Sequence, residues 1–230
     1  YNTATARGGG MRGLSLAATL TNCVFYGNTA TEGGGSFFTY DSDDGVGSTF
    51  TNCSIKNNTA SAGKGGGVMS QYSAISLFDT CEFTYNETSQ QGGGMYTDSA
   101  HPVIVDCVFE ENSASSKGGA LYGYNSSPDI DSCLFSSNSS GSNYGVVHTD
   151  GNAGVTVGTS TFCENIPTDL SGIYTDEGTN CFADSCTDSD DDGILDDCDG
   201  FLHVYQGESI QAVIDIASDG DTILVHSGTY

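Results

Sequence analysis

The chain has 230 residues with 30 acidic and only 5 basic side chains, which gives a formal net charge of −25. This balance argues against nucleic-acid binding, which needs cations to displace the phosphate counterions, and it disfavours docking on an anionic membrane. Hydrophobic residues make up 37% of the chain, including 11 Phe and 12 Tyr, so the chain is not a disordered acidic tail. No apolar run approaches the roughly 18 residues of a membrane span, so we expect no membrane insertion.

Residues 1–163 contain a repeat marked by cysteine, an apolar residue, asparagine and glycine. Cysteines fall 26 to 30 residues apart, and glycine clusters begin at Gly8, Gly33, Gly65, Gly92 and Gly118. The positions repeated in phase are Cys23, Cys53, Cys81, Cys107 and Cys133; Phe25, Ile55, Phe83, Phe109 and Phe135; and Asn28, Asn58, Asn86, Asn112 and Asn138. A sixth cysteine, Cys163, continues the spacing. Its unit lacks the Phe and shifts the Asn to Asn165, which suggests that the column ends there.

The spacing within each unit predicts β-strands. Cysteine and Phe, two residues apart, point to the same side of a strand, and the Asn lies at a turn. Apolar segments at 75–78, 103–105 and 155–157 predict further strands, and residues 1–163 contain no helical stripe. Three short strands per unit of about 26 residues describe one coil of a parallel β-helix. Stacked Phe would fill its bore, and stacked Asn would hydrogen-bond along its axis.

These residues resemble the right-handed β-helix repeats of polymorphic outer-membrane proteins and pectate-lyase-like surface proteins. Those repeats pair a G-G-A-I-like turn with an F-x-x-N turn. The resemblance covers residues 1–165 and implies an all-β fold, a right-handed parallel β-helix (solenoid) of about six coils. It says little about activity, and this sequence departs from the pattern by placing a cysteine ladder ahead of the Phe.

The ladder cysteines are expected to be small, buried core residues. The alternative is a disulfide between adjacent coils, although in-register parallel strands often aim the two sulfurs in the same direction. A metal site is disfavoured because the cysteines are far apart and lack a CxxC motif. Outside the ladder, one possible disulfide pairing joins Cys163 with Cys181 and Cys186 with Cys198, closing loops of 18 and 12 residues.

An acidic segment at 188–199 has the oxygen spacing of a calcium loop, with acids at positions 1, 3, 5 and 12 and a glycine at position 6. It resembles a thrombospondin type-3 calcium repeat, D-x-D-x-D-G-x-x-D-D-C-D. The resemblance implies Ca2+ ligands from the side chains of Asp188, Asp190, Asp192 and Asp199 and the carbonyl of Ile194, assisted by Asp196 or Asp197. We expect weak binding suited to millimolar extracellular calcium, and the alternative is a solvated acidic linker.

The predicted domain boundaries are 1–165 for the repeats, 166–186 for a terminal coil and Cys-containing loop, 187–199 for the calcium loop and 200–230 for a capping segment. In that segment an N-cap Ser209 precedes an amphipathic stripe, and a strand follows. The stripe consists of Ile210, Val213, Ile214 and Ala217. The segment resembles the cap helix and first strand of a next, or neighbouring, β-helix.

The chain starts in mid-coil with Tyr1 and shows no signal peptide, so we interpret it as an internal or processed piece. We expect either tandem copies in a longer chain or head-to-tail self-association into a filament. The nine cysteines argue against a cytosolic address. The prediction is therefore an extracellular or cell-surface, calcium-stabilised β-helix with a structural or adhesive role.

We do not expect an enzyme, because the five bases are scattered, the four histidines have no visible partner, and paired loop acids such as Asp129 and Asp131 are common. The alternatives are a fragment of a polysaccharide lyase or glycoside hydrolase, or a carbohydrate-binding module. Such a module would expose an aromatic row of Tyr72, Tyr96, Tyr122 and Tyr124. N-glycosylation motifs occur at Asn52, Asn57, Asn86, Asn125 and Asn138, and a glycan at Asn86 or Asn138 would break inward stacking.

Overall fold

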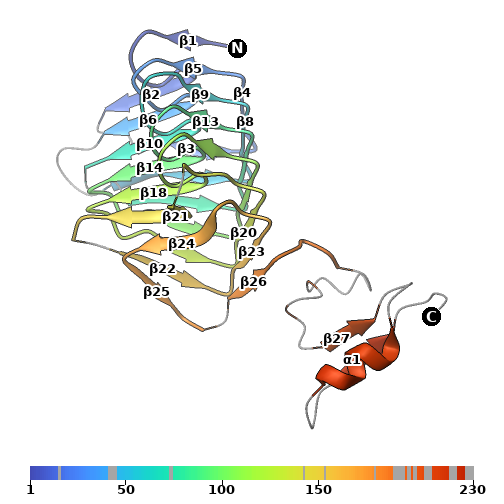
Figure 1. The fold of residues 1–230 in the computed structure, drawn as a ribbon. Helices are drawn as coiled ribbons and strands as arrows, with labels where there is room; N and C mark the ends of the chain where they lie inside the picture. Colours follow the sequence, from blue (N-terminus) through green and yellow to red (C-terminus); the bar gives the residue numbers. More distant parts are fainter. Residues whose placement is uncertain are drawn as a thin grey trace. The chain divides into compact units, whose positions relative to one another are not determined.

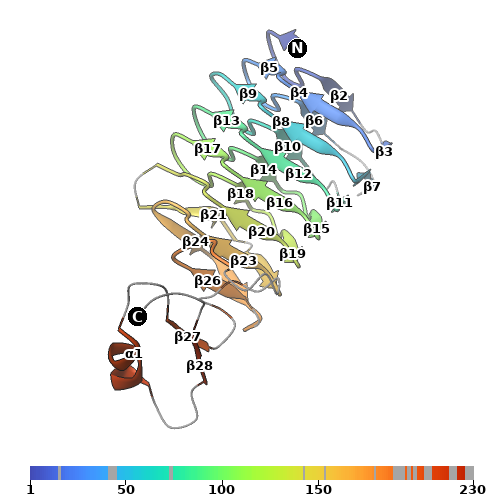
Figure 2. The same cartoon turned by 90° about the vertical axis from the view of Figure 1, so that its right-hand side faces the viewer.

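The computed structural model describes residues 1–14, 17–40, 46–72, 75–141, 143–152, 154–178, 180–188, 195, 198, 201–204, 209–217 and 222–225. They divide into two compact units, Tyr1–Asn180 and Cys181–Tyr230. The first unit is a parallel β-solenoid of about six coils, as predicted (Figure 1). Each strand pairs in parallel with the equivalent strand of the next coil, and Figure 2 shows the strands stacked as steps along the column.

The strands of the first unit stack into four sets. The first contains β1 (Thr3–Ala4), β5 (Thr29–Ala30), β9 (Thr59–Ala60), β13 (Glu87–Thr88) and β17 (Ser113–Ala114). The second, called here the β2–β24 sheet, contains β2 (Met11–Leu14), β6 (Phe37–Tyr40), β10 (Val68–Gln71), β14 (Met95–Asp98), β18 (Leu121–Tyr124), β21 (Gly145–Asp150) and β24 (Thr168–Gly172). The third contains β3 (Thr19–Thr21), β7 (Val46–Thr51), β11 (Ile75–Asp79), β15 (Val103–Val105), β19 (Asp129–Asp131), β22 (Val155–Gly158) and β25 (Tyr174–Asp176). The fourth contains β4 (Val24–Tyr26), β8 (Ser54–Lys56), β12 (Glu82–Thr84), β16 (Val108–Glu110), β20 (Leu134–Ser136) and β23 (Thr161–Cys163).

Stacked aromatic rings fill the bore of the solenoid. Phe83, Phe109 and Phe135 are fully buried, and adjacent rings lie nearly parallel with centroids 4.5 and 4.9 Å apart. Phe162 continues the stack at 4.7 Å from Phe135. Offset-stacked rings at this separation add to the stabilisation from burial. The hydrophobic core is therefore one continuous column.

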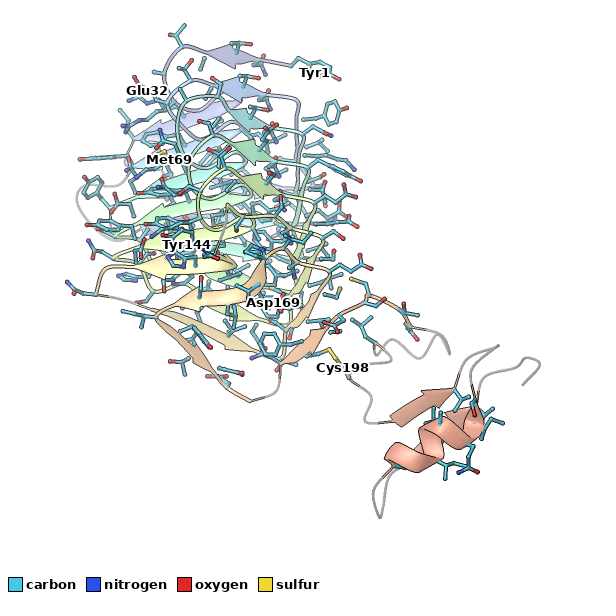
Figure 3. All side chains as sticks on the ribbon, in the orientation of Figure 1. Tyr1, Glu32, Met69, Tyr144, Asp169 and Cys198 are labelled. Carbon is cyan, nitrogen blue, oxygen red and sulfur yellow. A yellow bond between two sulfur atoms is a disulfide. The ribbon has the colours of Figure 1, made fainter. Side chains whose placement is uncertain are left out.

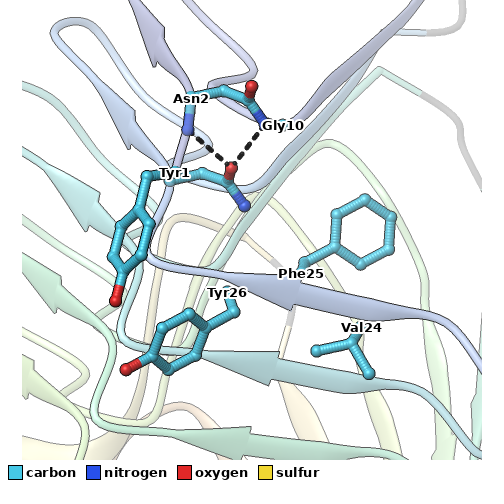
Figure 4. Close-up of a pocket in the computed structure, with 7 residues that line it drawn as sticks. Tyr1, Asn2, Gly10, Val24, Phe25 and Tyr26 are labelled. Atoms are coloured by element: carbon cyan, nitrogen blue, oxygen red, sulfur yellow. Dashed lines mark hydrogen bonds between the residues drawn. The ribbon is translucent and has the colours of Figure 1, made fainter.

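Buried asparagines join the coils through a ladder of hydrogen bonds. In each step, the backbone N–H and the Nδ2 of one Asn donate to the Oδ1 of the Asn in the next coil, at 2.9 to 3.1 Å. The ladder runs through Asn2, Asn28, Asn58, Asn86, Asn112, Asn138 and Asn165. Figure 4 shows its first step, where Asn2 donates to Asn28 beside a hollow of about 470 Å³.

The expected alignment of the last repeat is wrong by three residues. Phe135 pairs with Phe162, and Ser136, not Cys133, pairs with Cys163. Ser160 occupies the position of the ladder cysteine in this coil. Its Oγ accepts a hydrogen bond from the N–H of Cys133, as the Sγ of the next cysteine does for Cys81 and Cys107. The unit therefore keeps its Phe and its Asn165 and replaces only the cysteine, and the column continues into β24 and β25.

The second unit contains β26 (Cys181–Ala183), β27 (Phe201–Val204), α1 (Ile210–Ile216) and β28 (Thr222–Val225). Ser209 caps α1, as expected, with its side chain accepting from the N–H of Ala212. The expected stripe is incomplete, because Ile214 is 47% exposed. A strand that was not predicted, β27, precedes the helix and pairs in parallel with β28, so this segment is a β-α-β unit. Among the described residues, no helix has the length and apolarity needed to cross a membrane.

Candidate functional site on the outer face of one sheet

The candidate site lies on the outer face of the β2–β24 sheet. Side chains alternate across this sheet, so Phe37 points into the bore whereas Phe38 points outward. Strand register then places one outward side chain of each strand in a row, which we call the outer ladder. It consists of Arg12, Phe38, Met69, Tyr96, Tyr122, His148 and Ser171. Met69 is labelled in Figure 3.

Four of the five basic side chains lie over aromatic rings of this face. Measured to the ring centroids, the contacts are Arg7 at 5.1 Å and Arg12 at 5.6 Å over Phe38, Lys64 at 4.5 Å over Tyr96, and Lys117 at 4.3 Å over Tyr144. Such cation–π contacts contribute about 0.5–1 kcal/mol each where they are exposed. The bases that are scattered in the sequence are therefore gathered by the stacking of coils, which corrects our expectation.

A polar groove of about 320 Å³ crosses the first half of this face. Its walls include Arg7, Glu32, Lys64, Gln71 and Asp98. Arg7 pairs with Glu32 at 3.5 Å and donates to Gln71 at 3.1 Å. The groove therefore offers both donors and acceptors within one small area.

The aromatic row expected for a carbohydrate-binding surface is only half exposed. Tyr96 and Tyr122 stack with centroids 5.5 Å apart, but they are 1% and 5% exposed. Tyr72 and Tyr124 are 45% and 43% exposed. The long side chains that lie over the outer ladder bury its rings, so Tyr96 and Tyr122 cannot offer an open stacking platform.

At the other end of the outer ladder, His148 lies between Ser171 and Asp150. The Ser171 Oγ is 2.6 Å from His148 Nδ1, and Asp150 Oδ1 is 3.1 Å from His148 Nε2. The other oxygen of Asp150 accepts hydrogen bonds from Lys117 Nζ at 2.6 Å and Tyr122 OH at 2.8 Å. His148 is buried, whereas Ser171 is partly exposed.

Burial lowers the pKa of His148 and outweighs the opposing effect of Asp150. The pKa of Asp150 is also lowered: burial alone would raise it, but the hydrogen bonds from Lys117, Tyr122 and His148 outweigh burial. The imidazole is therefore neutral and the carboxylate ionised near neutral pH. This cluster contradicts our expectation that the histidines have no partner. The spacing of His148 and Asp150, two residues apart, already places both on one face of a strand. Ser171 belongs to the next coil, where the glycine cluster that marks this strand in earlier repeats is missing.

The chain matches the model of the right-handed β-helix region over residues 2–162. It belongs to the right-handed β-helix family. No curated protein and no solved structure matches the chain. The family membership establishes the fold of this β-helix, and its function rests on the surfaces described here.

In this β-helix the cysteines of the ladder, Cys23, Cys53, Cys81, Cys107 and Cys133, are free thiols. All but Cys23 are buried, and no disulfide joins adjacent coils among them. The hydrogen bond with Cys107, followed by burial, raises the pKa of Cys81. The thiol of Cys81 is therefore a protonated, weakly nucleophilic core group.

The expected disulfide pairing is wrong. Cys181 is joined to Cys198, with their Cα atoms 5.6 Å apart, and both Cys163 and Cys186 are also disulfide-bonded. A disulfide requires two Cα atoms within reach of each other, and the fold brings Cys198 to Cys181 rather than to Cys186. Disulfides of this kind persist in oxidising compartments, which is compatible with an extracellular protein.

Most of the predicted calcium loop lies outside the described residues, including Asp190, Asp192, Ile194, Asp196, Asp197 and Asp199. Asp188, Leu195 and Cys198 are described, and the N–H of Cys198 donates to the carbonyl of Leu195 at 2.7 Å in a tight turn. Within the described part of the chain, no group of three or more His, Cys, Asp or Glu could hold a metal ion. The calcium site therefore stays a prediction.

The glycosylation motifs fall into two structural groups. Asn86 and Asn138 are fully buried members of the asparagine ladder, so glycans there would require them to leave the stack. Asn52 and Asn57 are exposed and Asn125 is partly exposed. Only these three positions are open to modification in the folded β-helix.

Proposed function

We propose that this β-helix is a structural module of an extracellular protein, a stiff column that carries a calcium-dependent joint. The observation that supports this role most strongly is the unbroken asparagine ladder, which ties every coil from Asn2 to Asn165 to the next one. In a solenoid, each repeat contacts only its neighbours, so stability is a sum of such interfaces. A column with the same satisfied interface at every step keeps its shape along its length.

The joint is the acidic segment 188–199. Seven carboxylates within twelve residues repel one another unless a cation lies among them. Carboxylate and carbonyl oxygens are the ligands that calcium takes. Asp188, Asp190, Asp192, Asp199 and the carbonyl of Ile194 would hold the ion, with help from Asp196 or Asp197.

The partner that we propose is a further β-helix, either a tandem copy in a longer chain or a second molecule stacked head to tail. An edge strand of a parallel sheet offers the same row of backbone donors and acceptors as an inner strand, so another coil can extend it. Identical contacts repeated without closure produce a filament.

Calcium is expected to raise the thermal stability of the second unit, residues 181–230. Sites of this kind have dissociation constants of about 0.1–1 mM, so about 10 mM calcium should add roughly 1.4–2.7 kcal/mol by mass action. Scanning calorimetry with calcium and with a chelator would measure the shift. The double variant Asp190→Asn/Asp192→Asn should abolish it, whereas Asp129→Asn, on an exposed position of β19, should leave it intact. Identical transitions with calcium and with chelator would contradict the joint.

A second role, binding of a neutral glycan, is favoured by the polar groove beside Lys64 and Asp98. Mixed donors and acceptors suit sugar hydroxyls, and the charge of −25 disfavours an anionic polysaccharide. Affinity electrophoresis in gels containing hydroxyethyl cellulose should slow the wild-type chain. Asp98→Ala should weaken binding about tenfold, the equivalent of one lost hydrogen bond to a charged group. Equal mobility in gels with and without hydroxyethyl cellulose would refute this role.

A further inference from the structure

The hydrogen bonds around Ser171 fix which atoms donate and which accept. The Gly145 N–H donates to Ser171 Oγ at 2.5 Å, which leaves the hydroxyl proton of Ser171 directed to another acceptor. An ionised Asp150 can only accept, so the ring proton of His148 lies on Nε2. Nδ1 is then the acceptor for the Ser171 hydroxyl, at 2.6 Å, and the ring also has a hydrogen bond with the backbone of Ser171. The serine is thus hydrogen-bonded to a neutral base whose opposite nitrogen is fixed by a carboxylate.

Neighbouring strands hold this arrangement. His148 and Ser171 are register partners on β21 and β24, and both point outward. Asp150 lies two residues after His148 and is therefore on the same face of β21. Tyr144 packs edge-on against the His148 ring, with centroids 5.1 Å apart, and Tyr122 lies on the other side in the ladder. The imidazole is therefore fixed by packing as well as by hydrogen bonds.

We propose that Ser171 is a nucleophile for acyl transfer from esters, with His148 as its general base. A nucleophile, a base within hydrogen-bond reach and a group that orients the base together form the triad that activates a serine for such chemistry. Asp150 is the positioning residue, because it fixes the tautomer of His148 and stabilises the imidazolium that forms. Lys117 and Tyr122 keep Asp150 ionised.

The reaction proceeds in two balanced halves. Ser171 Oγ attacks the ester carbonyl while its proton moves to His148 Nδ1; the C–O bond to the alcohol then breaks, and the alkoxide leaves with that proton. Water then attacks the acyl-serine, giving one proton to Nδ1, and that proton returns to Ser171 Oγ as the carboxylic acid departs. Water is the only co-reactant, and no redox change occurs.

The surroundings indicate an uncharged, short-chain ester. Carboxylates are plentiful over the chain, so an anionic substrate would be repelled. His148 is buried and Ser171 only partly exposed, so the acyl group must be small enough to approach along the surface of the sheet. An O-acetyl group has this chemistry, and 4-nitrophenyl acetate is a suitable probe.

The decisive experiment is labelling of the full chain with a fluorophosphonate, which bonds covalently to activated serines, followed by peptide mass spectrometry. Label is expected on Ser171 and not on Ser137, a matched serine on the surface whose hydroxyl bonds to Glu164 and has no histidine. His148→Gln should slow both labelling and hydrolysis of 4-nitrophenyl acetate by about 10²–10⁴-fold, the usual contribution of a general base. Because the wild-type labelling requires no variant, misfolding cannot obscure it. Absence of label on Ser171, or labelling that His148→Gln leaves unchanged, would overturn the proposal.

The pH profile separates a catalytic His148 from a merely structural one. The base must be neutral, so the rate should be lost as pH falls through the pKa of His148, which burial places below its ordinary value. The groups facing the ring are Asp150, Lys117, Tyr122, Tyr144 and Ser171. Asp150→Asn removes the carboxylate that stabilises the protonated imidazole and raises the pKa of His148. The inflection should therefore move to still lower pH, and the rate should drop. A profile without an inflection in the acidic range would count against the proposed base.

Discussion

Replacing Asn112 with Ala is expected to destabilise the solenoid by about 3–5 kcal/mol, because it leaves several buried polar groups without partners, at roughly 1–3 kcal/mol each. The Asn112 Oδ1 accepts from the N–H and the Nδ2 of Asn86, and its Nδ2 donates to Asn138 and to the carbonyl of Phe83. All three asparagines are fully buried, so water cannot replace these bonds. Urea unfolding followed by circular dichroism would measure the loss.

The control for this variant is Asn152→Ala, at an exposed position outside the ladder. Substitutions at exposed positions usually change stability by less than about 0.5 kcal/mol. If Asn112→Ala were no more destabilising than Asn152→Ala, the ladder would not be what ties the coils together. Since whole domains have a stability of about 5–15 kcal/mol, the expected loss is a large fraction of the total.

Phe109→Ala is expected to cost about 3–5 kcal/mol, by loss of buried apolar area and creation of a cavity in the bore. The ring is fully buried and stacks on Phe83 at an interplanar angle of 1° and on Phe135 at 10°. Backbone hydrogen bonds between the coils fix their spacing, so the bore cannot collapse to fill the gap.

Phe109→Leu should cost much less, of the order of 1.5 kcal/mol, because it keeps most of the apolar volume. Tyr174→Ala removes an aromatic side chain that is 48% exposed on β25 and serves as the control. The same urea titration would compare the three variants. A cost below about 1 kcal/mol for Phe109→Ala would mean that the bore is not close-packed.

The fold could be predicted because, in a solenoid, residues that are one repeat apart in the sequence contact each other in adjacent coils. Residues 26 apart, such as Phe83 and Phe109, become neighbours through the repeat alone. The last repeat was misaligned because Cys163 follows Phe162 directly, and counting from cysteine placed the motif three residues late. The intervals between cysteines are variable, so the correct register of the last repeat is identified by the aromatic stack and by the asparagine ladder.

The surface was harder to predict than the core. Whether an outward tyrosine is open depends on what covers it, and the buried Tyr96 lies beneath Lys64 from a different turn of the same solenoid. His148 and Ser171, which are in contact, lie 23 residues apart in the sequence, across a coil that keeps Phe162 and Asn165 but lacks the glycine cluster that marks this strand in the earlier repeats. The disulfides likewise depend on the separation of Cα atoms rather than on loop length.

The proposed role as a calcium-jointed structural column is tested most directly by electron microscopy of the purified chain with calcium and with a chelator. We predict unbranched head-to-tail strings in calcium, dispersed single columns in chelator, and no strings from a chain that lacks residues 200–230. Single columns under both conditions would contradict assembly through the joint, and strings that persist without residues 200–230 would show that this segment does not connect the columns.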